Sequence, residues 1–464
     1  MNKKDLIFSN RDLWTLVWPL LIEQLLQITL GMADIIMVSS LGEASVSGVS
    51  LVDQLNILLT QIFAALATGG AVVCSQYIGS ESNDMAEKTA KQLIYSISAL
   101  ALFILVSGVA FHRPILRLIF GQVEDSVMAA SQKYFLITLL ALPSIALYNA
   151  AAALFRAEGN SRISMLIALL VNILNIGGNA IMIYGLGCGV EGVAIPTLVS
   201  RTAAAIVLFV ALYREKTGER NATISIKGIS KVHFDWHLIG KILKIGVPNG
   251  LESSTFQIGK ILVLSLITSY GTTAIAANAA ANTLASFEVL PGAAIGLAML
   301  TVVGQCTGAG RTDQASYYTK KLTGLAYAGF WVLNIPLLLS TWKILSLYGM
   351  SEETSKLAWL MTVWHGACGM LIWPLSFTLP NALRAAGDAA ITMVISMISM
   401  WTVRVGLSYV LTFNHFFGLV ERFGLPASFG AFSVWFAMII DWIVRSVCFV
   451  GRFASGAWKT KKVI

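Results

Sequence analysis

Residues 93–111 read LIYSISALALFILVSGVAF and contain no charged side chain. At a rise of about 1.5 Å per residue, a helix of this length crosses the hydrocarbon core of a bilayer, which is about 30 Å thick. Similar apolar runs recur at Phe135–Phe155 and Ile163–Leu186. Because these runs do not alternate with a period of two, they favour helices over a membrane β-barrel. The sequence therefore predicts an all-α integral membrane protein.

The composition of the whole chain agrees with a lipid environment. Of the 464 residues, 56% are hydrophobic and only 12% are charged, whereas a soluble domain carries about 25% charged residues. Polar breaks divide the chain into about twelve transmembrane helices. We place these spans at residues 13–38, 49–76, 90–111, 132–154, 162–185, 190–213, 242–268, 274–304, 319–340, 357–381, 389–412 and 428–450. The polar residues 1–14 lack the features of a signal peptide, so we expect the first span to be retained.

The basic residues indicate an orientation. With the N-terminus inside, 22 of the 32 Lys and Arg residues fall in cytoplasmic segments, six in external segments and four within spans. This asymmetry predicts that both termini are cytoplasmic. We expect a multi-pass protein of the cell (plasma) membrane, which in a bacterium is the inner membrane. It also explains the net charge of +8 without a nucleic-acid partner. The five cysteines have no metal-ligand spacing, and neither a metal nor a cofactor is expected.

The two halves of the chain resemble each other. An offset of 229 residues places Pro19 on Pro248 and Glu23 on Glu252 without a gap. The same offset also matches Gly42 with Gly271, Gln76 with Gln305, Gly79 with Gly308, Ala86 with Ala315, and Lys91 with Lys320. A second block, FRAEGN at 155–160 and LRAAGD at 383–388, repeats with an offset of 228. The shared Pro, Glu, Gln and Arg positions indicate an internal duplication.

The duplication predicts the domain organisation. We expect an N-lobe of spans 1–6 at residues 1–213, a cytoplasmic linker at 214–241, and a C-lobe of spans 7–12 at 242–464. Since each half contains an even number of spans, both halves enter the membrane in the same orientation. The two six-helix bundles are therefore expected to be related by a pseudo-twofold axis along the membrane normal, with a substrate site between them.

These repeated segments resemble the multidrug and toxic compound extrusion (MATE) family over essentially the whole chain. The resemblance rests on Trp18-Pro19, MADIIMV at 32–38 with Leu41-Gly42, QYIG at 76–79, RAEGN at 156–160, Val247-Pro248 through Glu252, and VGQ at 303–305. It implies export of drugs or metabolites, mostly cationic or amphipathic, in exchange for Na⁺ or H⁺. It also implies two six-helix bundles that meet in a V-shaped cavity.

Asp34 is the leading candidate for ion coupling. It lies in the outer half of the first span, where a charged side chain costs about 2.5–3.5 kcal/mol on insertion scales. One explanation is an aspartate at the membrane interface near the helix end. The alternative is a carboxylate that loads and releases H⁺ or Na⁺. Asp34 resembles the family's first-span aspartate, fifteen residues after a helix-bending proline, here Pro19. We favour the coupling role.

Span 5 presents Asn172, Asn175 and Asn179 on one helical stripe. In some branches of the family, an aspartate with an asparagine four residues earlier completes a cation site with the first-span aspartate. The matching pair here is Asn175 and Asn179, so the second acid is missing. We expect Asp34 to stand alone, which modestly favours H⁺. Asn172 is assigned to the substrate cavity, and hydrogen bonds between helices are the structural alternative for all three amides.

Three glutamates within spans are candidates for the substrate cavity: Glu23, Glu252 and Glu288. For Glu252 and Glu288, a structural acid bonded to a neighbouring span is an equally good explanation. Asp441 and Arg445 are four residues apart and are expected to neutralise each other. Partners for Arg201, Lys260 and Arg404 are not assigned.

Several other functions are disfavoured. A nucleotide-binding Gly-x-x-x-x-Gly-Lys-Ser/Thr loop and a Ser/His/Asp arrangement are absent from the sequence, which indicates neither an ATP-driven pump nor an enzyme. The main rival is a lipid-linked oligosaccharide flippase of the same superfamily, which would want a strongly basic cavity. An uncoupled channel-like protein is a further alternative. Membrane lipid is expected around the chain, and we expect a monomer.

Overall fold

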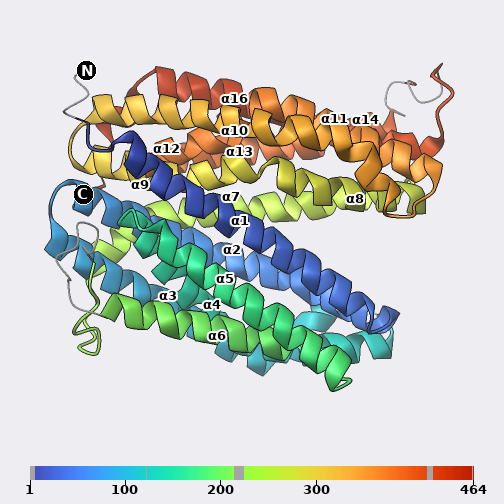
Figure 1. The fold of residues 1–464 in the computed structure, drawn as a ribbon, viewed down its shortest axis with the longest axis horizontal. Coiled ribbons are helices and arrows are strands. Elements are labelled where there is room, and N and C mark those ends of the chain that lie inside the picture. Colours follow the sequence, from blue (N-terminus) through green and yellow to red (C-terminus); the bar gives the residue numbers. More distant parts are fainter. Residues whose placement is uncertain (1–5, 122, 214–223, 415–417, 419–421, 462) are drawn as a thin grey trace. The chain divides into compact units, whose positions relative to one another are not determined.

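The computed structural model describes residues 6–121, 123–213, 224–414, 418, 422–461 and 463–464, and it is almost entirely helical (Figure 1). Up to Tyr213 the helices are α1 (Asn10–Ser39), α2 (Glu43–Gly79), α3 (Asn83–Phe120), α4 (Asp125–Ala157), α5 (Ser161–Ala180), η2 (Ile181–Gly185) and α6 (Glu191–Tyr213). After the linker come α7 (Trp236–Thr268), α8 (Thr272–Glu288), α9 (Leu290–Gly308), α10 (Thr312–Ser346), α11 (Glu352–Trp373), η3 (Pro374–Thr378), α12 (Leu379–Ala385), α13 (Ala389–Ile398), η4 (Ser399–Leu407), α14 (Ser408–Phe413), η6 (Ala427–Ala431), α16 (Phe432–Ala454) and η7 (Ala457–Thr460).

Among the described residues, eleven helices are long and apolar enough to cross a membrane. Apart from residues 190 and 289, the expected spans lie within helical segments, and the helices extend beyond them, as α3 (Asn83–Phe120) does around the span expected at 90–111. The prediction of an all-α membrane protein with about twelve spans is confirmed. One expectation is wrong in detail, because the single span at 274–304 is broken at Val289 between α8 and α9. Pro291 follows the break. Proline has no backbone N–H to donate to the preceding turn, and its ring clashes with that turn.

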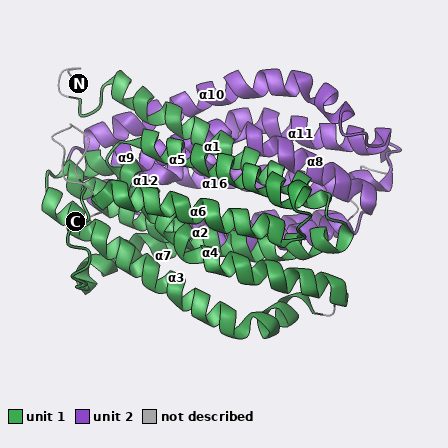
Figure 2. Ribbon diagram, turned by 60° about the horizontal axis from the view of Figure 1, so that its bottom comes forward, with its two compact units in different colours: residues 1–250, 304–310, 463–464 green, residues 251–303, 311–462 purple. Residues whose placement is uncertain are grey.

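The helices form two compact units, coloured separately in Figure 2. Unit 1 comprises residues 1–250, 304–310 and 463–464, and unit 2 comprises residues 251–303 and 311–462. In unit 1, α4 packs against α2, α3, α5 and α6, while α1 packs against α5. In unit 2, α11 packs against α8, α10 and α16, while α16 also packs against η4.

The division of the chain at a linker of residues 214–241 stays a prediction. Its first ten residues, 214–223, lie outside the described residues. The described remainder packs on α3, where Gln92 Nε2 donates to the carbonyl of His233 at 2.7 Å and Tyr95 Oη donates to the carbonyl of Ile229 at 2.7 Å. This segment is therefore attached to unit 1.

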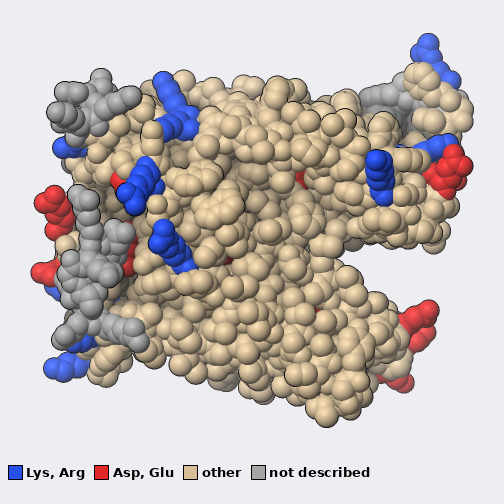
Figure 3. Space-filling model, viewed as in Figure 1, with Lys and Arg blue, Asp and Glu red and all other residues tan. Residues whose placement is uncertain are grey.

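The surfaces of the helices are apolar where a membrane would surround them. Large side chains are strongly exposed, including Phe103 (70%), Val332 (77%) and Leu339 (81%). On the face shown in Figure 3, charged side chains lie mostly toward the helix ends, and wide areas between them carry none. Exposing so continuous an apolar surface is unfavourable in water, whereas the hydrocarbon chains of a lipid bilayer can surround it.

The duplication is visible in the backbone. Gly42 precedes α2 with φ +89°, and its repeat counterpart Gly271 precedes α8 with φ +88°. Gly159 and Gly387, from the repeated Arg-Ala-x-Gly block, have φ of +87° and +93°. Residues with a Cβ rarely adopt this left-handed conformation, so both halves keep glycine where the chain turns between helices.

A second repeated feature is a reciprocal contact inside unit 1 between the C-terminal ends of α2 and α9. A Cβ added to Gly79 would lie 2.0 Å from the carbonyl oxygen of Gln305. In the mirror-image contact, a Cβ added to Gly308 would lie 1.9 Å from the carbonyl oxygen of Gln76. The two helices therefore approach so closely that only glycine fits, as in other tightly packed membrane helices.

Candidate functional site

A chain of polar side chains links α1, α5 and α6 in unit 1. Asn179 Nδ2 donates to Asp34 Oδ1 at 2.7 Å and also lies 3.2 Å from Asn175 Oδ1. Asn175 Nδ2 in turn donates to Thr197 Oγ1 at 2.9 Å. Asp34 is partly buried, while Asn175 and Asn179 are fully buried. The structure thus brings together the three residues predicted for ion coupling and adds Thr197; their role in coupling remains a prediction.

Asp34 has a second acid near it, so the expectation that it stands alone is wrong. Asp53, on α2, interacts electrostatically with Asp34. Tyr134 Oη, on α4, donates to Asp53 Oδ1 at 3.0 Å, and Asn56 Nδ2 lies 3.5 Å from the same oxygen. The acid that interacts with Asp34 therefore comes from span 2, and no spacing along span 5 reveals it. The argument that a lone acid favours H⁺ therefore no longer holds.

Two buried amide oxygens of α5 have no hydrogen-bond donor among the described residues. They are Asn172 Oδ1 and Asn179 Oδ1. The Asn172 side chain otherwise donates only to the carbonyl of Ala168 on its own helix. A buried acceptor without a donor is unfavourable. Asn179 Oδ1 could therefore act as a ligand to a cation held by Asp34, whereas no hydrogen bond joins Asn172 to that aspartate among the described residues.

The carboxylate of Glu23 is part of a buried ion pair and is not a free acid. Arg156 Nη1 lies 3.0 Å from Glu23 Oε1, and Ser164 Oγ donates to Glu23 Oε2 at 2.7 Å. Glu23 is 1% exposed. These contacts join α1 to α4 and α5, and they favour the structural explanation over the predicted substrate contact.

Breaking this ion pair is expected to destabilise the protein. Replacing Arg156 with Ala leaves the buried carboxylate of Glu23 without its charged partner, which costs about 3–5 kcal/mol. Replacing Glu23 with Ala is expected to cost less, because the side chain of Arg156 is only partly buried. The double variant removes both charges, so its free energy of unfolding should fall by clearly less than the sum of the two single effects. Thermal unfolding of the three purified variants measures this difference. Additive effects would show that the two side chains do not depend on each other.

Glu252 forms the matching pair in unit 2. Arg384 Nη2 lies 2.6 Å from Glu252 Oε1, and Arg384 Nη1 donates to Asn381 Oδ1 at 2.9 Å. Glu252 and Arg384 are the repeat counterparts of Glu23 and Arg156. The same pair in both halves indicates that Glu252, too, stabilises the fold, so its assignment to a substrate cavity gains no support.

Glu288 is buried in unit 2 among helices. Its carboxylate contacts His365 Nδ1 of α11, and its backbone carbonyl accepts from Asn334 Nδ2 of α10 at 3.1 Å. The side chains of Trp435 and Trp442 pack edge-on against the His365 ring. Glu288 is 0% exposed, so a substrate does not reach it in this conformation.

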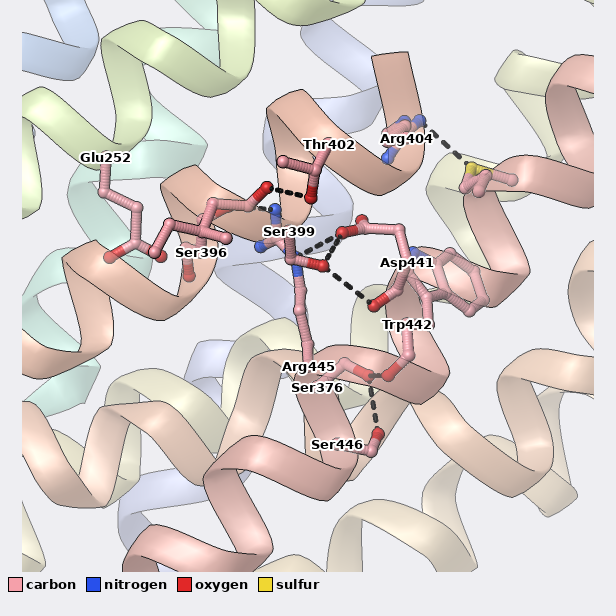
Figure 4. A network of polar contacts seen from close by, with 12 residues as sticks. Glu252, Ser376, Ser396, Ser399, Thr402, Arg404, Asp441, Trp442, Arg445 and Ser446 are labelled. Carbon is pink, nitrogen blue, oxygen red and sulfur yellow. Dashed lines mark hydrogen bonds and ion pairs between the residues drawn. The ribbon is translucent and has the colours of Figure 1, made fainter. Parts of the chain in front are cut away.

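Asp441 and Arg445 pair as the sequence predicts, inside the network drawn in Figure 4. Arg445 Nε lies 2.9 Å from Asp441 Oδ1, and Arg445 Nη2 donates to the carbonyl of Ser396 at 3.1 Å. The hydroxyl of Ser399 also donates to the Asp441 carboxylate. Both charged side chains are buried, and the network joins α13, η4 and α16.

The fold and the duplicated positions can be compared with known proteins. A family model described as MatE matches residues 19–181 and again residues 248–410, which together make up more than half of the chain. Both ends of the second match are displaced by the offset that aligns Pro19 with Pro248. The chain belongs to the MATE family.

Relatives of this MATE transporter cover its whole length. It is similar to an uncharacterized transporter, YisQ, of Bacillus subtilis (strain 168), with 28% identity over 97% of this chain and 95% of the relative. It is also similar to a probable multidrug resistance protein, NorM, of Thermotoga maritima, with 24% identity over 100% of this chain and 96% of the relative. A crystal structure of MATE in complex with MaL6 has the same fold, with a TM-score of 0.85 at 19% identity and 97% coverage of both chains.

These matches confirm the resemblance found in the sequence and the presence of two repeated halves. The protein is a multi-pass membrane transporter, not an enzyme, and its relatives are bacterial. The axis that relates the two halves of this MATE protein stays a prediction.

Sequence reasoning missed Asp53 of this MATE protein for an identifiable reason. The search for a second acid followed span 5, the position that the family suggests. Asp53 nevertheless lies inside the expected span at 49–76. A charged residue within a span is costly in lipid and therefore needs an explanation. This argument, applied to every such residue, would have identified Asp53 as a candidate.

Pro19 lies inside α1, which continues without a break from Asn10 to Ser39. Its role as a bending point is therefore a proposal about another conformation of this MATE protein. Proline removes one backbone hydrogen bond from a helix, so a bend at this position costs less than elsewhere.

Proposed function

We propose that this transporter exports cationic and amphipathic compounds in exchange for H⁺ or Na⁺. The observation that supports the proposal is the pair of carboxylates in the spans of unit 1. Neither Asp34 nor Asp53 accepts a hydrogen bond from a basic side chain within the described part of the chain. Arg201 interacts electrostatically with Asp34, but its guanidinium lies over the ring of Tyr148, 5.4 Å from the centroid.

An acid in a membrane span without a bonded base needs a neutralising partner. A proton supplies it directly. Na⁺ prefers oxygen ligands, as other hard cations do, and this site offers carboxylate oxygens together with the unpaired Asn179 Oδ1 and the hydroxyl of Thr197. These groups therefore suit either ion.

The proposed cycle couples the ion to the substrate through one charge. Loading Asp34 with an ion cancels its negative charge and weakens its attraction for a cationic substrate, which leaves to the outside. Ion loading also biases α1 toward a form bent at Pro19. Release of the ion to the inside restores the charge. An ion can drive this cycle only because it binds one conformation more tightly than the other.

Transport from proteoliposomes tests the proposal. Purified protein is reconstituted with a fluorescent cationic dye, rhodamine 123, and H⁺ and Na⁺ gradients are imposed separately. We expect dye transport to accelerate severalfold under one gradient and to stop when that gradient is collapsed. Equal rates with and without both gradients would refute coupled exchange and favour an uncoupled, channel-like protein.

A further inference from the structure

The spans of unit 2 contain more basic than acidic side chains. Three acids lie within them, and each has a basic partner: Glu252 with Arg384, Glu288 with His365, and Asp441 with Arg445. Two further bases, Lys260 and Arg404, form no salt bridge within the described residues. In the spans of unit 1, the acids Asp34 and Asp53 form no salt bridge among the described residues, and neither does the base Arg201, whose guanidinium lies over the ring of Tyr148.

Arg404 is poorly satisfied in its surroundings. Its guanidinium lies 5.3 Å from the ring centroid of Phe256, and Nη2 contacts the thioether sulfur of Met438 at 3.1 Å. Nε is buried and has no hydrogen-bond partner among the described residues. A thioether is a weak acceptor, so this guanidinium has no strong hydrogen-bond acceptor in the part of the chain that the structure describes.

Lys260 belongs to the same cluster. It follows Gly259, where the absent side chain lets α7 approach η4; a Cβ there would lie 2.3 Å from Met400 Cε. One turn beyond Met400 is Arg404, and the two cations interact electrostatically. Lys260 is exposed and Arg404 is partly buried, so the pair has an open side.

The acid beside this cluster does not neutralise it. Asp441 interacts electrostatically with Arg404 but is hydrogen-bonded to Arg445. The guanidinium of Arg445 also lies over Phe256, at 5.7 Å. Three positive charges therefore share one negative charge in a setting where lipid makes unpaired charge expensive.

We propose that Lys260 and Arg404 bind the anionic group of a transported compound, so that the substrates include zwitterionic and anionic aromatic amphiphiles. This inference rests on the proposed export function and defines its substrate class. A carboxylate fits best. Arginine can donate two parallel hydrogen bonds to it, and the adjacent ring of Phe256 offers an aromatic surface to the rest of the molecule.

A matched pair of dyes isolates the contribution of the carboxylate. Rhodamine 110 carries a free carboxylate, and rhodamine 123 is its methyl ester. Their binding to the full chain in lipid nanodiscs is measured by fluorescence polarisation without any ion gradient. We expect Lys260→Gln and Arg404→Gln each to weaken rhodamine 110 binding by about tenfold or more, as the loss of a charge-assisted hydrogen bond predicts. Binding of rhodamine 123 should change by less than about twofold, because it lacks the anion.

Three controls keep the result specific. Lys260→Arg retains the charge and should retain most of the discrimination between the dyes. Arg404→Lys retains the charge but not the two parallel hydrogen bonds, so it should lose part of that discrimination. Lys343→Gln removes the same charge from an exposed position of unit 2 and should change neither affinity. Equal losses for both dyes, or none, would overturn the proposal.

The lipid-linked alternative is tested in the same assay. A polyprenyl diphosphate is added as a competitor of rhodamine 110. If it displaces the dye at a concentration far below the dye's own dissociation constant, and if this displacement requires Lys260 and Arg404, the site binds a lipid anion and our proposal is overturned. The assay needs no gradient, so its failure leaves ion-coupled export of rhodamine 123 standing. Conversely, loss of coupling would leave the binding result intact.

Discussion

Asp34→Asn is expected to reduce ion-driven efflux of rhodamine 123 by at least about 100-fold, which corresponds to about 2.7 kcal/mol. The amide has nearly the same size as the carboxylate and keeps an oxygen that can accept from Asn179. It has no negative charge and does not exchange a proton. The ion would then bind both conformations equally, and a ligand without differential affinity shifts no equilibrium.

Two other aspartates make this result interpretable. Asp84→Asn makes the same chemical change at an exposed position of α3 and should leave efflux unchanged. Asp53→Asn removes the second acid and should lower efflux as well, because Asp53 interacts with Asp34. The rate of dye efflux from proteoliposomes is compared at equal protein content. Full efflux by Asp34→Asn would reject the coupling role.

Gly308→Ala is expected to destabilise the protein strongly. The new methyl group would lie 1.9 Å from the carbonyl oxygen of Gln76 and 2.6 Å from its Cα. These are backbone atoms of α2, which cannot rotate away as a side chain does, so the two helices must separate. Overpacking costs about 1–3 kcal/mol and sometimes more, and here we expect the upper part of that range.

The repeat provides an internal check on this expectation. Gly79→Ala creates the mirror-image clash with Gln305 and should be similarly destabilising. Gly324, inside α10, has nothing within 4 Å of an added Cβ, so Gly324→Ala should be neutral or slightly stabilising. Melting temperature in detergent and the monodisperse fraction on gel filtration report the difference. Similar melting temperatures for Gly308→Ala and Gly324→Ala would mean that the close contact is not maintained in the membrane.

The Glu23–Arg156 and Glu252–Arg384 pairs show where reasoning from the sequence was incomplete. The repeat alignment correctly identified all four positions as equivalent. It did not show that each acid would meet the arginine of its own half, about 130 residues away along the chain. Acids within spans were therefore assigned to a cavity, although buried charges in proteins are usually paired.

The sequence by itself determined the membrane environment, the approximate spans, the duplication and the family. These follow from local properties: the length of apolar runs, the positions of Lys and Arg, and residues repeated at a constant offset. It also singled out Asp34 by its position within a span and by its resemblance to the family's first-span aspartate, and the same resemblance pointed to Asn175 and Asn179.

Only the tertiary structure decided which charges neutralise one another. Glu23, Glu252 and Glu288 each contact a basic side chain, and Asp53 interacts electrostatically with Asp34. Lys260 and Arg404 form no salt bridge among the described residues. The physical reason is that the energy of a charge in a membrane depends on the groups within a few ångströms. Those groups come from helices that are far apart in the sequence, so no local pattern specifies them.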